Sequence, residues 1–151
     1  MDERRRVAAV VVAAGTGTRA AGLDGLPKQY RAIAGRAVLA HTVAAFLDHP
    51  AVDRVLVVIH PDHADLYAAA LADLAASARL APPVVGGATR QASVRAGLEA
   101  LRHEAPDLVL VHDAARPFLS AAVIDRTIAA LAASDGALVG LGIVDTLKRA
   151  D

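Results

Sequence analysis

Cysteine is absent from this chain of 151 residues, and aromatic side chains make up only 3% of it. Without cysteine the chain can form no disulfide and can bind no metal through thiolates. The 16 lysines and arginines balance the 16 aspartates and glutamates, so no overall basic field draws the chain to nucleic acid. No apolar run approaches the roughly 20 residues that cross a bilayer. These absences favour a cytoplasmic enzyme or binding protein with no nucleic-acid or membrane partner.

Apolar residues make up 55% of the chain, and its length suits one domain, residues 1–151, with its own core. Strands are predicted at residues 7–13, 52–60, 82–87 and 136–144, and residues 107–117 are predicted to form a strand that runs into a loop. Helices are predicted at 38–48, 61–78, 90–103 and 120–133. Ser120 is expected to cap the last of these helices. Strands that alternate with helices indicate a three-layer α/β/α sandwich around a mainly parallel, Rossmann-like sheet.

Three unusual segments follow predicted strands of this sheet. They are the glycine-rich stretch "AAGTGTRAAG" from residue 13, "GGATR" from residue 86, and "HDAARP" from residue 112. The carboxyl ends of parallel strands share one edge, and ligands bind α/β sheets beyond that edge. We therefore expect the three segments to converge on one crevice.

The glycine-rich stretch has the composition of an anion-binding loop. Gly15 and Gly17 allow the backbone to approach a ligand closely, and successive amides in such a loop can cradle an anion. Thr16 and Thr18 add hydroxyl groups. Arg19 offers a fork suited to phosphate oxygens, and Lys28, stiffened by the preceding proline, supplies a compact positive charge. The stretch therefore predicts a loop that wraps a nucleoside triphosphate.

Other interpretations of this stretch compete with that one. A dinucleotide-binding turn requires an acidic residue at the end of the second strand, where this chain has His60. A Walker loop requires Gly-Lys-Ser/Thr at the start of a helix, and that sequence is absent. A third possibility stays open: an ordinary surface turn on which Arg19 and Lys28 are solvated and bind nothing.

Longer motifs narrow the choice. The pattern G-x-G-T-R with a following P-K resembles the signature loop of nucleotidyltransferases. The chain also contains "PKQY" (27–30), "GGATRQASVRAGL" (86–98), "VHDAARP" (111–117) and "DTLKR" (145–149). Together these resemble the 2-C-methyl-D-erythritol 4-phosphate cytidylyltransferase family from about residue 7 to the end. The resemblance implies a fold like that of nucleotide-diphospho-sugar transferases, with CTP and methylerythritol phosphate as substrates and Mg²⁺ as cofactor.

The resemblance also implies roles for single residues. Arg19 and Lys28 are the expected catalytic cations. Asp113, Arg116 and Thr146 are expected to contact methylerythritol phosphate, and Asp113 to help hold the metal. The expected nucleotide-binding residues are Ala13, Ala14, Gly15, Thr16, Gly17, Thr18, Gly86, Gly87, Arg90 and Ser93. Several of these residues have a purely structural alternative. Gly86 and Gly87 can form a turn, Arg90 and Ser93 can begin a helix, and Arg116 can form a surface ion pair.

The expected reaction needs few protein groups. A phosphate nucleophile with a second pKa of about 6 is already largely ionised at neutral pH, so no general base is required. Positioning and charge neutralisation dominate phosphoryl-type transfers. A magnesium ion keeps most of its waters and binds phosphates well. A zinc site at His60 and His63 is a minor alternative, because Asp62 and Asp65 are the only nearby residues with suitable spacing to add ligands. His112 is expected to pack or hydrogen-bond rather than to act in catalysis.

The chain stops just after "DTLKRA", whereas enzymes of the resembled family continue beyond that motif. The resemblance therefore implies an amino-terminal portion that retains the CTP half of the site, while the full-length protein is expected to be a homodimer. Two rival functions stay open. One is nucleotidyl transfer to another sugar or polyol phosphate, and the other is a non-catalytic nucleotide-binding module.

Overall fold

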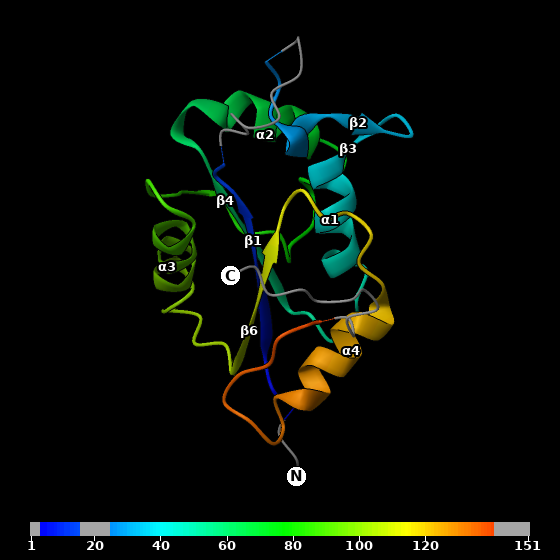
Figure 1. Cartoon of the computed structure of the whole chain (residues 1–151), viewed down its shortest axis with the longest axis vertical. Coiled ribbons are helices and arrows are strands. Elements are labelled where there is room, and N and C mark those ends of the chain that lie inside the picture. Colours follow the sequence, from blue (N-terminus) through cyan, green and yellow to red (C-terminus); the bar gives the residue numbers. More distant parts are fainter. Residues whose placement is uncertain (1–3, 16–24, 141–151) are drawn as a thin grey trace, which may run out of the picture.

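The computed structural model describes residues 4–15 and 25–140. Its main sheet consists of β1 (Val7–Ala13), β4 (Arg54–Ile59), β5 (Val84–Val85) and β6 (Leu108–Asp113). These strands lie in the order β5-β4-β1-β6, and every pair is parallel. The sheet is therefore the parallel α/β sheet that the alternating sequence pattern predicts (Figure 1).

The central strand β1 is buried on both faces because its sequence, "VAAVVVA", carries no polar side chain. Ala9 and Val11 face one layer and belong to a core that includes α1 (Val38–Leu47). Ala8 and Val10 face the other layer, where Leu101 follows α3 (Arg90–Ala100). Alternate residues of one strand thus contribute to two separate cores.

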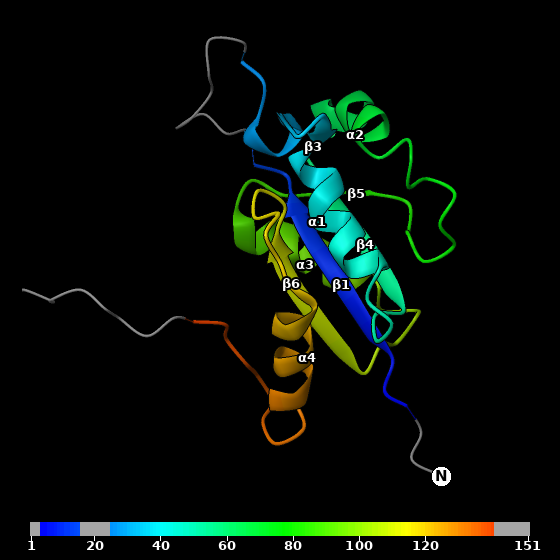
Figure 2. The same ribbon diagram turned by 90° about the vertical axis from the view of Figure 1, so that its right-hand side faces the viewer.

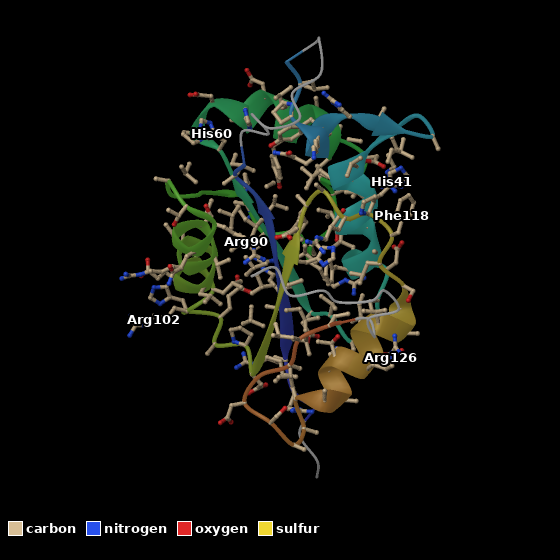
Figure 3. All side chains as sticks on the ribbon, viewed as in Figure 1. His41, His60, Arg90, Arg102, Phe118 and Arg126 are labelled. Atoms are coloured by element: carbon tan, nitrogen blue, oxygen red, sulfur yellow. The ribbon has the colours of Figure 1, made fainter. Side chains whose placement is uncertain are left out.

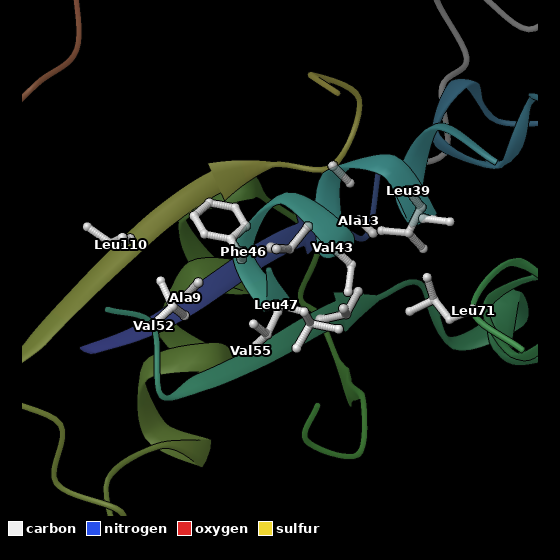
Figure 4. Close-up of a cluster of buried hydrophobic side chains, with 14 of the residues drawn as sticks. Ala9, Ala13, Leu39, Val43, Phe46, Leu47, Val52, Val55, Leu71 and Leu110 are labelled. Carbon is white, nitrogen blue, oxygen red and sulfur yellow. The ribbon is translucent and has the colours of Figure 1, made fainter. Parts of the chain in front are cut away.

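Helices cover both faces of the sheet. The helices α1 and α4 (Ala121–Ala130) lie on one face and α3 lies on the other (Figures 1 and 2). Phe46 and Val43 of α1 pack against Ala9 and Leu110 in the larger core (Figure 4). The three-layer arrangement predicted from the sequence is confirmed.

On the opposite face, a glycine lets α3 approach the sheet closely. A Cβ at Gly97 would lie 2.6 Å from Val10 Cγ1 and 3.0 Å from Val58 Cγ2. No side chain fits at this position without moving the sheet or the helix. The helix start is fixed separately, since the Thr89 hydroxyl accepts a hydrogen bond from the Ala92 amide at 3.0 Å.

Two helix predictions need correction. The helix predicted over 61–78 is a 3-10 turn (Pro61–His63) followed by α2 (Ala64–Ala70), after which the chain turns. It turns because Leu80 must return to form a parallel bridge with Val55 of β4. Ser120 does occupy the N-cap position of α4, but its side chain makes no capping hydrogen bond.

The strands also differ from the prediction in two places. The two-stranded hairpin of β2 (Ala32–Ile33) and β3 (Arg36–Ala37) was not expected. The strand predicted at 136–144 is wrong for residues 136–140, which form no strand, and its remaining residues lie outside the described part. Leu138 is fully exposed at 101% and Val139 is 67% exposed, so these two apolar side chains are not part of the core.

Within residues 4–15 and 25–140, none of the helices has both the length and the apolar character that a membrane crossing requires.

Candidate functional site

The described parts of the three predicted segments converge at the carboxyl edge of the sheet, whereas the glycine-rich stretch is described only as far as Gly15. In the parallel register, Val12 of β1 lies beside Asp113 of β6, and Ile59 of β4 lies beside Val85 of β5. The residues that follow these strand ends therefore share one edge. They are Ala14 and Gly15 after β1, Gly86 and Gly87 after β5, and Ala114 to Arg116 after β6.

Ala14, Gly86 and Ser93 meet closely at this edge. A Cβ on Gly86 would lie 2.6 Å from Ala14 Cβ and 2.6 Å from Ser93 Oγ. Only glycine fits between them, and the Gly86 amide is already bonded to the Ile59 carbonyl at 2.8 Å. The sequence predicts that these three residues belong to one nucleotide site, and in the structure they lie next to one another.

Ser93 holds the two-glycine segment through its hydroxyl. It is 2% exposed. Its Oγ accepts from the Gly87 amide at 3.2 Å and lies 3.0 Å from the Thr89 carbonyl, to which it donates. The contact between Ser93 and a nucleotide stays a prediction, because the partners seen for its hydroxyl are backbone groups.

Lys28 begins a short 3-10 turn, Lys28–Tyr30, beside the end of β1. Pro27 is extended, with ψ of 144°, and its carbonyl accepts the Tyr30 amide at 2.9 Å. Lys28 is exposed, and its side chain contacts no partner in the described ranges. An exposed lysine on a rigid turn is available to bind an anion.

Arg90, Asp113 and Arg116 form an ion-pair cluster at the end of β6. Arg90 Nε and a terminal nitrogen of its guanidinium each lie 2.9 Å from Asp113 Oδ1, and Arg116 Nε lies 3.1 Å from Oδ2. Arg90 reaches from the first turn of α3 toward β6 (Figure 3). Both carboxylate oxygens are therefore engaged, and the cluster as a whole keeps one excess positive charge.

This cluster is open to solvent, with the Arg90 and Arg116 side chains 61% and 75% exposed and that of Asp113 33% exposed. Each exposed pair contributes under about 1 kcal/mol to stability. The arginines can consequently leave Asp113 for a phosphate at little cost.

His112 behaves as predicted for a packed residue. Its ring lies edge-on to Phe46 at 5.5 Å, and its Nε2 is 2.9 Å from the Arg116 carbonyl. Strand alternation thus turns His112 toward the α1 layer, while its neighbour Asp113 faces Arg90 on the α3 side.

Two histidines, His60 and His63, follow β4 three positions apart. His60 and His63 lie 4.8 Å apart between ring centroids. No group of three His, Cys, Asp or Glu side chains suited to a metal occurs in the described part of the chain. Burial, followed by the proximity of His60, lowers the pKa of His63 and favours its neutral form.

Some predicted site residues cannot be placed. Thr16, Gly17, Thr18, Arg19 and Thr146 lie outside the described residues.

Sequence reasoning also missed two buried polar side chains at this edge. Gln29 is 5% exposed and donates to two carbonyls at the end of β1. Thr42 is fully buried in α1, and its hydroxyl donates to the Ala114 carbonyl at 2.9 Å. Nothing in the spacing of either residue indicates such a bond, although Gln29 lies in the motif "PKQY".

A hollow of about 330 Å³ lies at the other, amino edge of the sheet. Arg6, Asp53, Arg54, His103 and Glu104 contribute to its lining. Asp53 and Glu104 oppose its positive charges, and Arg54 is paired with Glu104 at 3.0 Å. The hollow therefore offers a weaker anion site than the carboxyl edge.

A parallel sheet edge with closely packed glycines, an exposed lysine and two solvent-accessible arginines is typical of α/β domains that bind phosphorylated ligands. A family model described as "IspD: 2-C-methyl-D-erythritol 4-phosphate cytidylyltransferase" matches residues 7–151. The chain belongs to this family.

Curated relatives share about half of the chain's residues. The "Bifunctional enzyme IspD/IspF" of Rhizorhabdus wittichii is 54% identical over 151 residues, which are 100% of this chain and 37% of the relative. The protein of the same name from Mesorhizobium japonicum is 52% identical over 143 residues, covering 95% of this chain and 34% of the relative. The chain thus spans little more than a third of these relatives.

Solved structures of the family share the fold. A structure described as 4-diphosphocytidyl-2C-methyl-D-erythritol synthase superposes with a TM-score of 0.76 at 33% identity, covering 97% of this chain and 64% of that one. The 4-diphosphocytidyl-2C-methyl-D-erythritol synthase of Anaerococcus prevotii gives a TM-score of 0.68 at 30% identity, covering 85% of this chain and 52% of that one.

Proposed function

We propose that the protein to which this chain belongs transfers the cytidylyl group of CTP to 2-C-methyl-D-erythritol 4-phosphate and releases pyrophosphate. The observation that carries the proposal is the meeting, at one sheet edge, of the Lys28 turn, the Gly86 contact and the Arg90–Asp113–Arg116 cluster. Such an edge suits two phosphorylated substrates, one on each side of β1. Membership in a family described as 2-C-methyl-D-erythritol 4-phosphate cytidylyltransferase supports this choice of acceptor and of a cytidylyl donor.

The nucleotide half of the proposed site lies between β1 and β5. Ala13, Ala14 and Gly15, together with the segment Thr16–Thr18, would follow the triphosphate. Gly86 and Gly87 would border the cytosine, since bare backbone can approach a flat base and hydrogen-bond its edge. Lys28 and Arg19 would neutralise the charge that develops as pyrophosphate leaves.

The acceptor half of the proposed site lies beyond β6. Arg116 is the group that would bind the phosphate of methylerythritol phosphate, with Asp113 and Thr146 contacting the same substrate. Arg90 sits on the boundary, because it starts on α3 beside the glycines and ends on Asp113. An arginine at that position can neutralise charge on either substrate.

The proposed chemistry is a displacement at the α-phosphorus of CTP. A bond forms from an oxygen of the acceptor phosphate to that phosphorus, and the bond to the oxygen bridging toward the β-phosphate breaks. The acceptor phosphate is already ionised near neutral pH, so no proton has to be removed. The protein's contribution is alignment and charge neutralisation.

The proposal includes a Mg²⁺ ion bound to the triphosphate. The described residues fit an ion that phosphate oxygens and waters hold, which is the coordination magnesium prefers. They fit a protein-built metal site poorly, because both oxygens of Asp113 already bind guanidinium groups. Asp113 could join such an ion only by releasing one arginine.

The test is pyrophosphate release with CTP, Mg²⁺ and a panel of acceptor phosphates, comparing wild type with Lys28→Ala. Loss of turnover far beyond any loss of CTP affinity would identify Lys28 as catalytic. Arg102→Ala is the matched control, since Arg102 is an exposed cation beyond α3 that points away from Arg90 (Figure 3).

The outcomes separate the rival functions. Turnover with another sugar or polyol phosphate alone would indicate the rival acceptor, and nucleotide binding without turnover in the full-length protein would indicate a binding module. The homodimer stays a prediction of the family resemblance, and the cytoplasmic location stays a prediction from the composition of the chain. Chromatography of the full-length protein checks the first of these.

A further inference from the structure

Gln29 is a buried polar residue in the turn that carries Lys28. Its side-chain Nε2 donates to the Ala13 carbonyl at 2.9 Å and to the Gly15 carbonyl at 2.9 Å. Both amide hydrogens are therefore used, and both go to the segment where β1 ends. A buried amide without partners is costly, so these bonds strongly favour a single orientation of the side chain.

The two bonds fix the backbone around Ala14. In a trans peptide the N–H points opposite to the C=O, and the described residues contain no cis peptide bond. When Gln29 draws the Ala13 carbonyl toward itself, the Ala14 amide must point away from it. The direction of the first loop peptide is thereby set before any ligand arrives.

The same residue fixes Lys28. Gln29 is the central residue of the turn Lys28–Tyr30, which is closed by the bond from the Tyr30 amide to Pro27 and by one from the Arg31 amide to the Lys28 carbonyl at 3.2 Å. Tyr30 on the other side is 7% exposed and anchors the turn in the core. Lys28 thus directly precedes a buried glutamine that is hydrogen-bonded to the end of β1.

We propose that Gln29 is a positioning residue that holds Lys28 and the start of the glycine-rich loop in mutual register for a triphosphate. The inference rests on the proposed function and adds a residue to its nucleotide half. Without this connection the loop and the lysine would have to be ordered during binding, which lowers affinity without removing any ligand contact.

The experiment measures binding of inorganic triphosphate and of CTP, each with Mg²⁺, by calorimetry on this chain. Gln29→Met keeps the length of the side chain but removes both donors. We expect the affinity for each ligand to fall by about tenfold. The two losses should be similar, because both ligands carry the same polyphosphate. Gln29→Asn keeps the amide on a shorter side chain and should lose less.

Two controls separate positioning from general destabilisation. Gln91→Met makes the same change at an exposed glutamine of α3. Thr42→Val removes another buried hydroxyl, which bonds the Ala114 carbonyl after β6 and the Val38 carbonyl within α1. Both should leave triphosphate affinity within about twofold, although Thr42→Val should lower the melting temperature. A fall in affinity that only tracks the melting temperature across all these variants would overturn the proposal.

A double-mutant cycle with Lys28→Ala gives the decisive readout. If Gln29 acts through Lys28, Gln29→Met should cost much less in a Lys28→Ala background than in wild type. If the two substitutions lower the affinity independently, the proposed role of Gln29 is wrong. The same holds if Gln29→Met binds normally while Lys28→Ala binds poorly. Either result would leave the proposed function intact. If wild type binds neither ligand, the proposed function fails and this inference with it.

Discussion

Replacing Gly86 by alanine tests how tightly the nucleotide half of the site is packed. The added Cβ would lie 2.6 Å from Ala14 Cβ, 2.6 Å from Ser93 Oγ and 3.1 Å from Ser93 Cβ. None of these atoms can move freely: the Ala14 methyl is rigid, and the Ser93 hydroxyl is bonded to Gly87 and Thr89. The Gly86 backbone is itself tied to Ile59.

The expected cost follows from that geometry. Overpacking of a rigid site typically costs about 1–3 kcal/mol, so urea denaturation should show Gly86→Ala less stable by that amount. CTP affinity should fall as well, because Ala14 and the Gly86–Gly87 segment are pushed apart. Gly136→Ala is the control, since a Cβ at Gly136 meets nothing within 4 Å. Wild-type stability and CTP affinity in Gly86→Ala would refute the reasoning.

Two substitutions and a pH titration test other parts of the structure. Gly97→Ala gains about 1 kcal/mol of helix propensity but forces a methyl against Val10 and Val58, so denaturation should still show a net loss of stability. Asp113→Asn should change the free energy of unfolding by less than about 1 kcal/mol because its ion pairs are exposed, yet it should slow pyrophosphate release by about tenfold or more; equal rates would contradict a role for this carboxylate. Burial, with a contribution from Tyr67, raises the pKa of Tyr30 to about 12, and burial also raises the pKa of Tyr67. The chain has two tyrosines, so its ultraviolet titration should show no phenol ionising at the ordinary value of 10.0. Because the folded state holds the Tyr30 proton more tightly, stability should be fully present below that value and should fall as the pH rises toward 12.

The sequence predicted most of the sheet because its signals were local. The run "VAAVVVA" carries no polar side chain, which in an alternating α/β pattern indicates a central strand. The placement of Gly86, Asp113 and Ala14 on one edge then followed from parallel topology alone.

The misses arose where distant contacts override local preference. The alanine-rich stretch after Ala70 has helical propensity, yet it turns so that Leu80 can pair with Val55. The bonds of Gln29 could not be predicted either, since they join residues 14 and 16 positions apart through a fold that only the structure reveals.

A crystal structure of the chain with CTP and Mg²⁺ tests the central claim most directly. The account predicts the triphosphate at the carboxyl end of β1, within reach of Lys28 Nζ, with the cytosine beside Gly86 and Gly87. A nucleotide bound instead in the hollow at the amino edge, lined in part by Arg6, Arg54 and His103, would contradict it.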